Sequence, residues 1–171
     1  SDPSFQILIT LIVFIILYLF NNKLEAICCA FNIGVTGFIN LVLKNTIKRP
    51  RPIGIKLVEA HGYSFPSGHS SISTAIGIVL IYFIIKRIKN KKVAYSMSGI
   101  VLIYLILVGI SRVYVGAHYP TDILGGWVIA IIWSYISIVA YNFCINKGVN
   151  KYLDKHFTIK LNIFKDKTKS I

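Results

Sequence analysis

The sequence predicts an all-α fold, a polytopic bundle of transmembrane helices with five spans in this chain of 171 residues. Two observations predict it. Apolar residues make up 55% of the chain and mean hydropathy is +0.68, above the near-neutral value of a soluble domain. These residues also occur in continuous runs, and a run of about 20 apolar residues crosses the hydrocarbon core of a bilayer. The polar segments between the runs leave no room for a separate soluble domain.

Each run is apolar on all faces, as expected of helices exposed to lipid. The expected spans are Phe5–Phe20, Leu24–Leu43, Gly68–Ile85, Val93–Ile110 and Ile123–Ile145.

The segments support this assignment in order along the chain. The first is short, but it lacks the basic start and the cleavage pattern of a signal peptide. The second carries small and amide residues that suit close helix–helix contact, namely Asn32, Gly34, Gly37 and Asn40. The third begins after Ser67, a typical N-cap residue. A basic loop precedes the fourth span, and a short polar segment that ends at Asp122 precedes the fifth.

Lysine and arginine residues are distributed unequally between the two sides of this bundle. The turn at 21–23, the loop at 86–92 and the tail from 146 onward would share one side and hold thirteen of them, against six on the other side. The positive-inside rule puts the thirteen in the cytoplasm and segments 44–66 and 111–122 on the outer face. We therefore expect a transmembrane domain at 1–146, carrying any catalytic residues, and a basic cytoplasmic tail at 147–171.

The number of spans and the net charge also predict an upstream helix and the partners of the protein. An odd number of spans puts the N-terminus outside, so we expect the natural protein to have one more helix upstream, six in all. A net charge of +13 favours either nucleic acid or anionic lipid as a partner. The chain is mostly apolar and has no basic-aromatic groove. We therefore expect its partner to be the membrane bilayer, and we expect neither nucleic acid nor an obligate protein partner.

The two outer segments carry more polar residues than anchoring requires. Lys44, Arg51 and Arg112 supply three fixed cations, and guanidinium groups suit forked contact with phosphate oxygens. Ser67 and Gly68 stand at the start of a helix, whose free N–H groups bind anions. A phosphate group fits this set better than a carboxylate does.

Two histidines and one carboxylate complete the candidate site. His118 and Asp122 are four residues apart, on one face if that stretch is helical, although Pro120 could distort it. A carboxylate that holds one imidazole nitrogen leaves the other free as a nucleophile or a base. His69 is then expected to protonate the leaving oxygen. Few acids lie on this face, and three cations repel a metal ion, so no metal or other cofactor is expected.

These residues fall into three motifs: Lys44-x6-Arg51-Pro52, Pro66-Ser67-Gly68-His69, and Ser111-Arg112-x5-His118-x3-Asp122. In order and in position beside apolar runs, they resemble the signature motifs of the type 2 phosphatidic acid phosphatase family. Arg49-Pro50 offers a competing register for the first motif, but that register would need a lysine where Val42 stands.

The resemblance implies a role for each matching residue. His118 would be the nucleophile that forms a phosphohistidine, Asp122 would orient it, and His69 would be the general acid. The remaining matching residues would bind the phosphate, namely Lys44, Arg51, Ser67, Gly68 and Arg112.

The expected activity is therefore metal-independent hydrolysis of a lipid phosphate or diphosphate at the outer face of a cell membrane. Undecaprenyl diphosphate is the favoured substrate from the habit of the family, with phosphatidylglycerophosphate and phosphatidic acid as alternatives. A phosphotransferase that uses the same site stays open. A non-catalytic lipid-binding protein is disfavoured by the His–Asp pair, and a soluble haloperoxidase with the same motifs by the apolar spans.

Overall fold

The computed structural model describes residues 23–54, 57–149 and 152, and in this part of the chain it contains four α-helices. They are α2 (Lys23–Ile47), α3 (Gly68–Arg87), α4 (Lys91–Tyr114) and α5 (Pro120–Asn146). All four are long and apolar enough to cross a membrane. The second to fifth predicted spans are thus confirmed as helices within a residue or a few of their expected ends. The predicted span Phe5–Phe20 lies outside the described residues.

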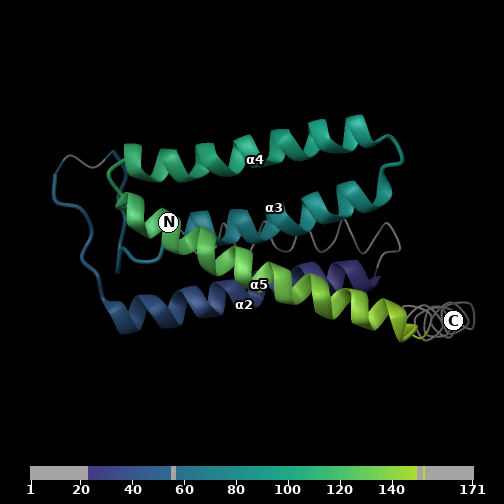
Figure 1. Cartoon of the computed structure of the whole chain (residues 1–171). Helices are drawn as coiled ribbons and strands as arrows, with labels where there is room; N and C mark the ends of the chain where they lie inside the picture. Colours follow the sequence, from purple (N-terminus) through teal and green to yellow (C-terminus); the bar gives the residue numbers. More distant parts are fainter. Residues whose placement is uncertain (1–22, 55–56, 150–151, 153–171) are drawn as a thin grey trace, which may run out of the picture.

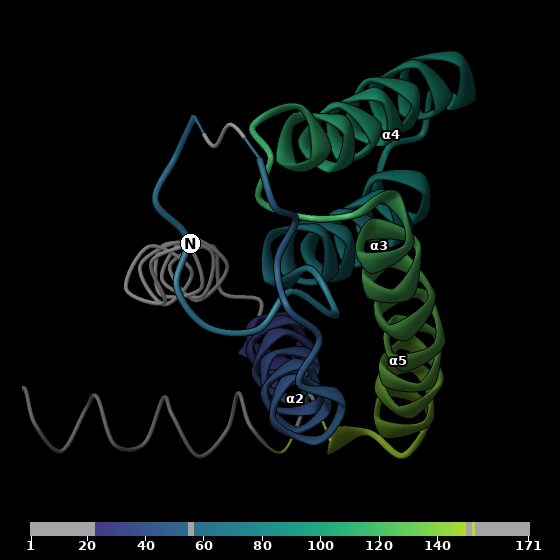
Figure 2. The ribbon, with the colours of Figure 1, turned by 90° about the vertical axis from the view of Figure 1, so that its left-hand side faces the viewer.

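Successive helices run in opposite directions, and α3 lies at the centre of the bundle (Figure 1). It packs against α2, α4 and α5, whereas α4 has only a small contact with α5 (Figure 2). This arrangement brings the C-terminal ends of α2 and α4 and the N-terminal ends of α3 and α5 to one end of the bundle. The basic loop between α3 and α4 lies at the opposite end.

Local sequence explains where the helices begin. Ser67 caps α3 by accepting a hydrogen bond from the backbone N–H of Ser70, and Asn90 caps α4 in the same way. Pro120 occupies the first turn of α5, where the missing N–H of proline has no cost. The stretch from His118 is therefore not continuously helical. Pro120 starts the helix instead of distorting one.

Amide side chains within α2 join it to its neighbours. The Asn32 amide donates to the Ala75 carbonyl at 3.0 Å and to the Ser134 hydroxyl at 3.1 Å. The Asn40 amide donates to the Ser71 hydroxyl at 2.8 Å. Hydrogen bonds of this kind hold helices together where the surrounding lipid offers no partner, so the expected contact role of these asparagines is confirmed.

Close packing of α5 on α3 requires a glycine at position 126. A Cβ atom there would lie 2.9 Å from the backbone oxygen of Ser67 and 2.9 Å from the hydroxyl of Ser71. Gly126 thus lets the first turns of the two helices approach each other directly below the polar end of the bundle.

Candidate active site

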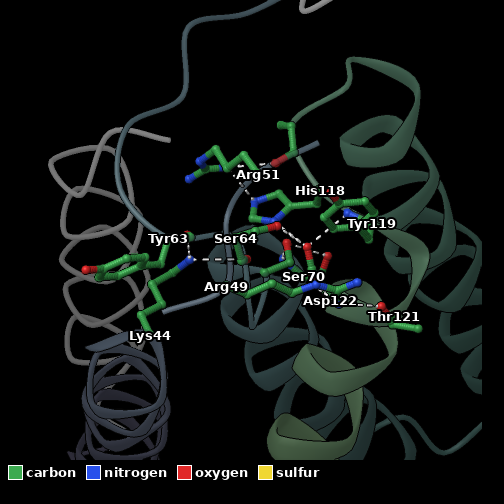
Figure 3. Close-up of polar contacts among 12 residues, drawn as sticks. Lys44, Arg49, Arg51, Tyr63, Ser64, Ser70, His118, Tyr119, Thr121 and Asp122 are labelled. Carbon is green, nitrogen blue, oxygen red and sulfur yellow. Dashed lines mark hydrogen bonds and ion pairs between the residues drawn. The ribbon is translucent and has the colours of Figure 1, made fainter. Parts of the chain in front are cut away.

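The candidate site occupies the end of the bundle where the four helices and the loop from 48 to 67 meet. Figure 3 shows Lys44 entering from α2, Arg49, Arg51 and Ser64 from the loop, and Asp122 from α5. Residues far apart in the sequence are therefore in contact here.

The carboxylate of Asp122 lies at the centre of this group and has no exposed surface. Its Oδ1 accepts a hydrogen bond from Nη1 of Arg49 at 2.9 Å. Its Oδ2 accepts from the hydroxyl of Ser64 and, at 2.9 Å, from the backbone N–H of Tyr119. Nδ1 of His118 lies 3.4 Å from the same Oδ2, without the geometry of a hydrogen bond.

His118 is buried between this carboxylate and a guanidinium group. Its side chain is 2% exposed, and Nε2 lies 3.4 Å from Nη1 of Arg51. Burial, followed by the charges of Arg51 and Lys44, lowers the pKa of His118 to about 4, although Asp122 opposes this shift. The imidazole is therefore neutral at pH 7, with one nitrogen toward a carboxylate and the other toward a cation.

Arg51 is held mainly by backbone carbonyl groups. It donates to the oxygens of Gly62 at 3.0 Å, His61 at 2.8 Å and Ala117 at 2.8 Å. Burial lowers the pKa of this guanidinium, and Asp122 opposes the shift. Since arginine titrates far above neutrality, the group stays charged, and its contacts fix a positive charge beside His118.

Lys44 is fixed in a similar manner. Its ammonium group donates to the carbonyl oxygen of Tyr63 at 2.7 Å and lies 3.4 Å from that of Ser64. The two cations of the first motif thus hold the loop from 61 to 64 on the end of the bundle.

The start of α3 is tied to the start of α5 through the backbone. The N–H of Ser67 donates to the carbonyl of Asp122 at 3.0 Å, while the buried Ser67 hydroxyl accepts from the hydroxyl of Ser70 at 3.1 Å. Gly68 is the first residue of the helix. The second motif therefore lies within one hydrogen bond of Asp122.

His69 and Arg112 lie beside this group, at one end of a cavity of about 590 Å³ between α3 and α4. Nδ1 of His69 is buried and has no partner in the described structure. Nε of Arg112 donates to the hydroxyl of Ser111 at 3.2 Å. Below these residues, the cavity is lined mostly by apolar side chains, among them Ile72, Ile76, Leu80, Ile100, Tyr104 and Val108.

The structure thus divides the predicted residues into two neighbouring sets. Direct side-chain or backbone contacts join Lys44, Arg51, His118 and Asp122 to the loop that carries Ser64. Over the described ranges, no side-chain hydrogen bond links His69 or Arg112 to the side chains of His118 and Asp122; these two residues line the cavity instead. The backbone does connect Arg112 to His118, because the His118 N–H donates to the Arg112 carbonyl at 3.3 Å.

The sequence analysis missed two contacts of Asp122. Arg49 appeared there only in a rejected motif register, and Ser64 was not singled out. For Arg49 a signal existed, because a buried carboxylate requires a compensating cation. For Ser64 the sequence gives none, since its contact depends on the path of the loop.

Metal binding requires several ligands at one point. Among the residues that the structure describes, no three His, Cys, Asp or Glu side chains are grouped closely enough to hold a metal ion.

Comparison with known proteins gives consistent matches. The model of the PAP2 superfamily matches residues 25–145. Phosphatidylglycerophosphatase B of Bacillus subtilis is 39% identical over 107 residues, which are 60% of this chain and 51% of that protein. Undecaprenyl-diphosphatase BcrC of the same organism is 31% identical over 147 residues, covering 72% of this chain and 71% of that protein. The chain thus spans about half the length of the first of these relatives.

A solved structure shares the fold as well. The crystal structure of a transmembrane PAP2 type phosphatidylglycerolphosphate phosphatase from Bacillus subtilis superposes with a TM-score of 0.67 at 32% identity. The match covers 80% of this chain and 68% of the other. The family model spans more than half of the chain and includes all three motifs, so this chain belongs to the PAP2 superfamily.

Proposed function

We propose that this chain is a lipid phosphatase that removes phosphate through a covalent intermediate on His118. The observation that carries the proposal is a neutral, buried imidazole with Nδ1 toward Asp122 and Nε2 toward Arg51. A phosphoryl group held by that guanidinium would present its phosphorus atom to the lone pair of Nε2.

In the first step, Nε2 of His118 attacks the terminal phosphorus and the bond to the leaving oxygen breaks. That oxygen belongs to the lipid alcohol in a monophosphate, and it is the bridging oxygen in a diphosphate, which leaves as the lipid monophosphate. His69 donates a proton to the departing oxygen. The imidazole becomes positively charged as the P–N bond forms, and the carboxylate of Asp122 stabilises that charge.

In the second step, water attacks the phosphohistidine. His69, now neutral, accepts a proton from this water, the P–N bond breaks and inorganic phosphate leaves. In both steps the phosphate oxygens are bound by three cations and by the start of α3, namely Lys44, Arg51, Arg112, Ser67 and the N–H of Gly68. Because these groups stabilise the negative charge, the mechanism needs no metal ion.

A lipid fits this site because the cavity beside it is apolar. His69, Ser111 and Arg112 lie at one end, and aliphatic side chains of α3 and α4 line the rest. A chain in that cavity would place its headgroup next to His69 without leaving the bilayer. Among lipids we favour undecaprenyl diphosphate, and phosphatidylglycerophosphate is the second candidate. The similarity to undecaprenyl-diphosphatase BcrC supports the first substrate, and the similarity to phosphatidylglycerophosphatase B supports the second.

We also place the site on the outer face of the membrane. The basic loop between α3 and α4 lies at the opposite end of the bundle, and the positive-inside rule assigns such a loop to the cytoplasm.

The direct test offers purified protein three lipids side by side: undecaprenyl diphosphate, phosphatidylglycerophosphate and phosphatidic acid. We expect phosphate release from at least one, no loss of activity in a chelator, and loss of activity in His118→Ala with folding retained. Wild-type activity in that variant would remove His118 as nucleophile. Transfer of the phosphate to an added lipid acceptor instead of water would identify a phosphotransferase.

A further inference from the structure

Among the residues that the structure describes, Arg49 is the lysine or arginine that forms an ion pair with the buried carboxylate of Asp122. Its Nη1 lies 2.9 Å from Oδ1, and the carboxylate has no exposed surface. A charge in such a place requires a compensating partner. His118 cannot supply the positive charge, because it is neutral at pH 7. Arg49 therefore supplies the positive charge in contact with this carboxylate.

Arg49 is itself held firmly against the start of α5. Its Nη1 also donates to the hydroxyl of Thr121 at 2.6 Å, and its guanidinium carbon lies 4.2 Å from the centre of the Tyr119 ring (Figure 3). A planar guanidinium that stacks on an aromatic ring has a defined orientation that an ammonium group would not reproduce.

Arg49 and Ser64 each donate a hydrogen bond to a different oxygen of the carboxylate. Arg49 binds Oδ1 and Ser64 binds Oδ2, and the backbone N–H of Ser64 donates to the carbonyl of Arg49 at 2.8 Å. Rotation of the carboxylate about its Cβ–Cγ bond would break both contacts. These two hydrogen bonds thus keep Oδ2 on the side where Nδ1 of His118 lies.

We infer that Arg49 is a positioning residue for the reaction at His118, acting through Asp122. This inference rests on the proposed function and goes beyond it, since Arg49 occupies an unspecified position of the first motif. Arg51, by contrast, faces the nucleophilic nitrogen itself.

The charges around His118 give the inference a measurable sign. Arg51 from the loop and Lys44 from α2 disfavour its protonated form, and Asp122 from α5 favours it. Arg49 offsets part of the Asp122 charge. Its removal would strengthen the pull of Asp122 on a proton at His118, so the pKa of His118 would rise.

The experiment compares Arg49→Gln and Arg49→Lys with Lys48→Gln, which removes the same charge from the exposed neighbouring position. For Arg49→Gln we expect kcat to fall about tenfold or more, as is typical for partners that orient an active group. KM should change little, and the acid limb of the kcat/KM profile should move to higher pH. Lys48→Gln should match the wild type.

Arg49→Lys separates charge from shape. It should leave the acid limb near its wild-type position, because the charge is kept, while kcat falls because an ammonium group lacks the planar group that stacks on Tyr119. Should Arg49→Gln fail to fold, Arg49→Lys alone decides: a wild-type kcat in that variant would overturn the inference.

A readout without turnover distinguishes this inference from the proposed function. The imidazole of His118 can be titrated by NMR in micelles, with its signals assigned by their loss in His118→Gln. Absence of phosphate release by the wild type would refute the proposed function, and the titration would still report on Arg49. An unchanged His118 titration in Arg49→Gln, or a raised KM with wild-type kcat, would overturn the positioning role.

Discussion

At the scale of single residues, the chemistry of His118 depends on the balance of charges around it. Two cations and burial oppose its protonation, and one carboxylate favours it. A nucleophile must be unprotonated, so this balance would suit the proposed role of His118 at neutral pH without a separate base. The carboxylate then becomes valuable only when positive charge develops on the ring.

The acid limb of activity should therefore lie far below the value of a free histidine. Burial above all lowers the pKa of His118 from 6.5 to about 4, so the proposed nucleophile stays neutral until pH falls to that region. We expect kcat/KM to decline with a midpoint near pH 4, once the ionisation of the substrate has been titrated separately. A midpoint near 6.5 that His61→Gln leaves in place would contradict this assignment.

The stability of the fold should follow the same group. Because the folded pKa of His118 is depressed, its contribution is present in full above pH 6.5 and is lost as pH falls from 6.5 to about 4. Thermal melting of His118→Gln should lack this part of the pH dependence. If the melting temperatures of the two proteins changed in parallel from pH 7 to 4, His118 would not contribute to the pH dependence of stability.

We expect the hydroxyl of Ser64 to contribute both to stability and to activity, because it donates to the buried carboxylate of Asp122. Ser64→Ala removes a buried donor from Asp122, which should lower stability by about 1–3 kcal/mol and lower kcat by loosening the carboxylate. Ser98→Ala is a matched control, because the Ser98 hydroxyl is buried but donates only to its own helix. Equal effects of the two changes on kcat would contradict the role of Ser64.

At the scale of elements, the site depends on how closely α5 approaches α3. The first turns of both helices carry site residues, and the Ser67 N–H joins them through the carbonyl of Asp122. A side chain at Gly126 would collide with backbone rather than with a movable side-chain end, so the helices would have to separate.

Gly126→Ala should accordingly lower the melting temperature and the activity together. We expect a loss of about 1–3 kcal/mol from overpacking, measured by thermal unfolding in detergent. Gly99→Ala on α4 serves as the control, because a Cβ there meets nothing within 4 Å. It should be neutral or slightly stabilising, since alanine favours a helix over glycine. An equally harmless Gly126→Ala would mean that α5 can shift without affecting the site.

Helix ends were harder to predict than helices. Hydropathy predicted four of the described elements, but it placed Arg112 in a connecting loop, whereas α4 continues to Tyr114. Polar residues in the last turn of a helix look like a loop when only apolar runs are read. The start of α5 at Pro120 follows from proline chemistry, since proline is favoured in the first turn of a helix, whereas the apolar run begins only at Ile123.

At the scale of the whole molecule, motif order and helix direction together determine the site. Each motif adjoins a helix end, and an alternating bundle brings those ends to one face, so the convergence of Lys44, Arg51, His118 and Asp122 could be expected from the sequence. The contacts of Arg49 and Ser64 could not, because they depend on the path of the loop between α2 and α3. The roles of the site residues and the first span at Phe5–Phe20 stay predictions.

The orientation of the molecule in the membrane is the last quantity that the charge pattern predicts. The site and the loop at Lys86–Lys92 lie at opposite ends of the bundle, so an outer site requires an inner loop. A cysteine at exposed position His61 should react with a membrane-impermeant maleimide on intact cells, and one at exposed Asn90 only after lysis. The three native cysteines lie in α2 and α5, and replacing them with alanine removes their background. If only Asn90→Cys were labelled on intact cells, the orientation would be the opposite of the predicted one. The substrate would then have to lie in the cytoplasmic leaflet.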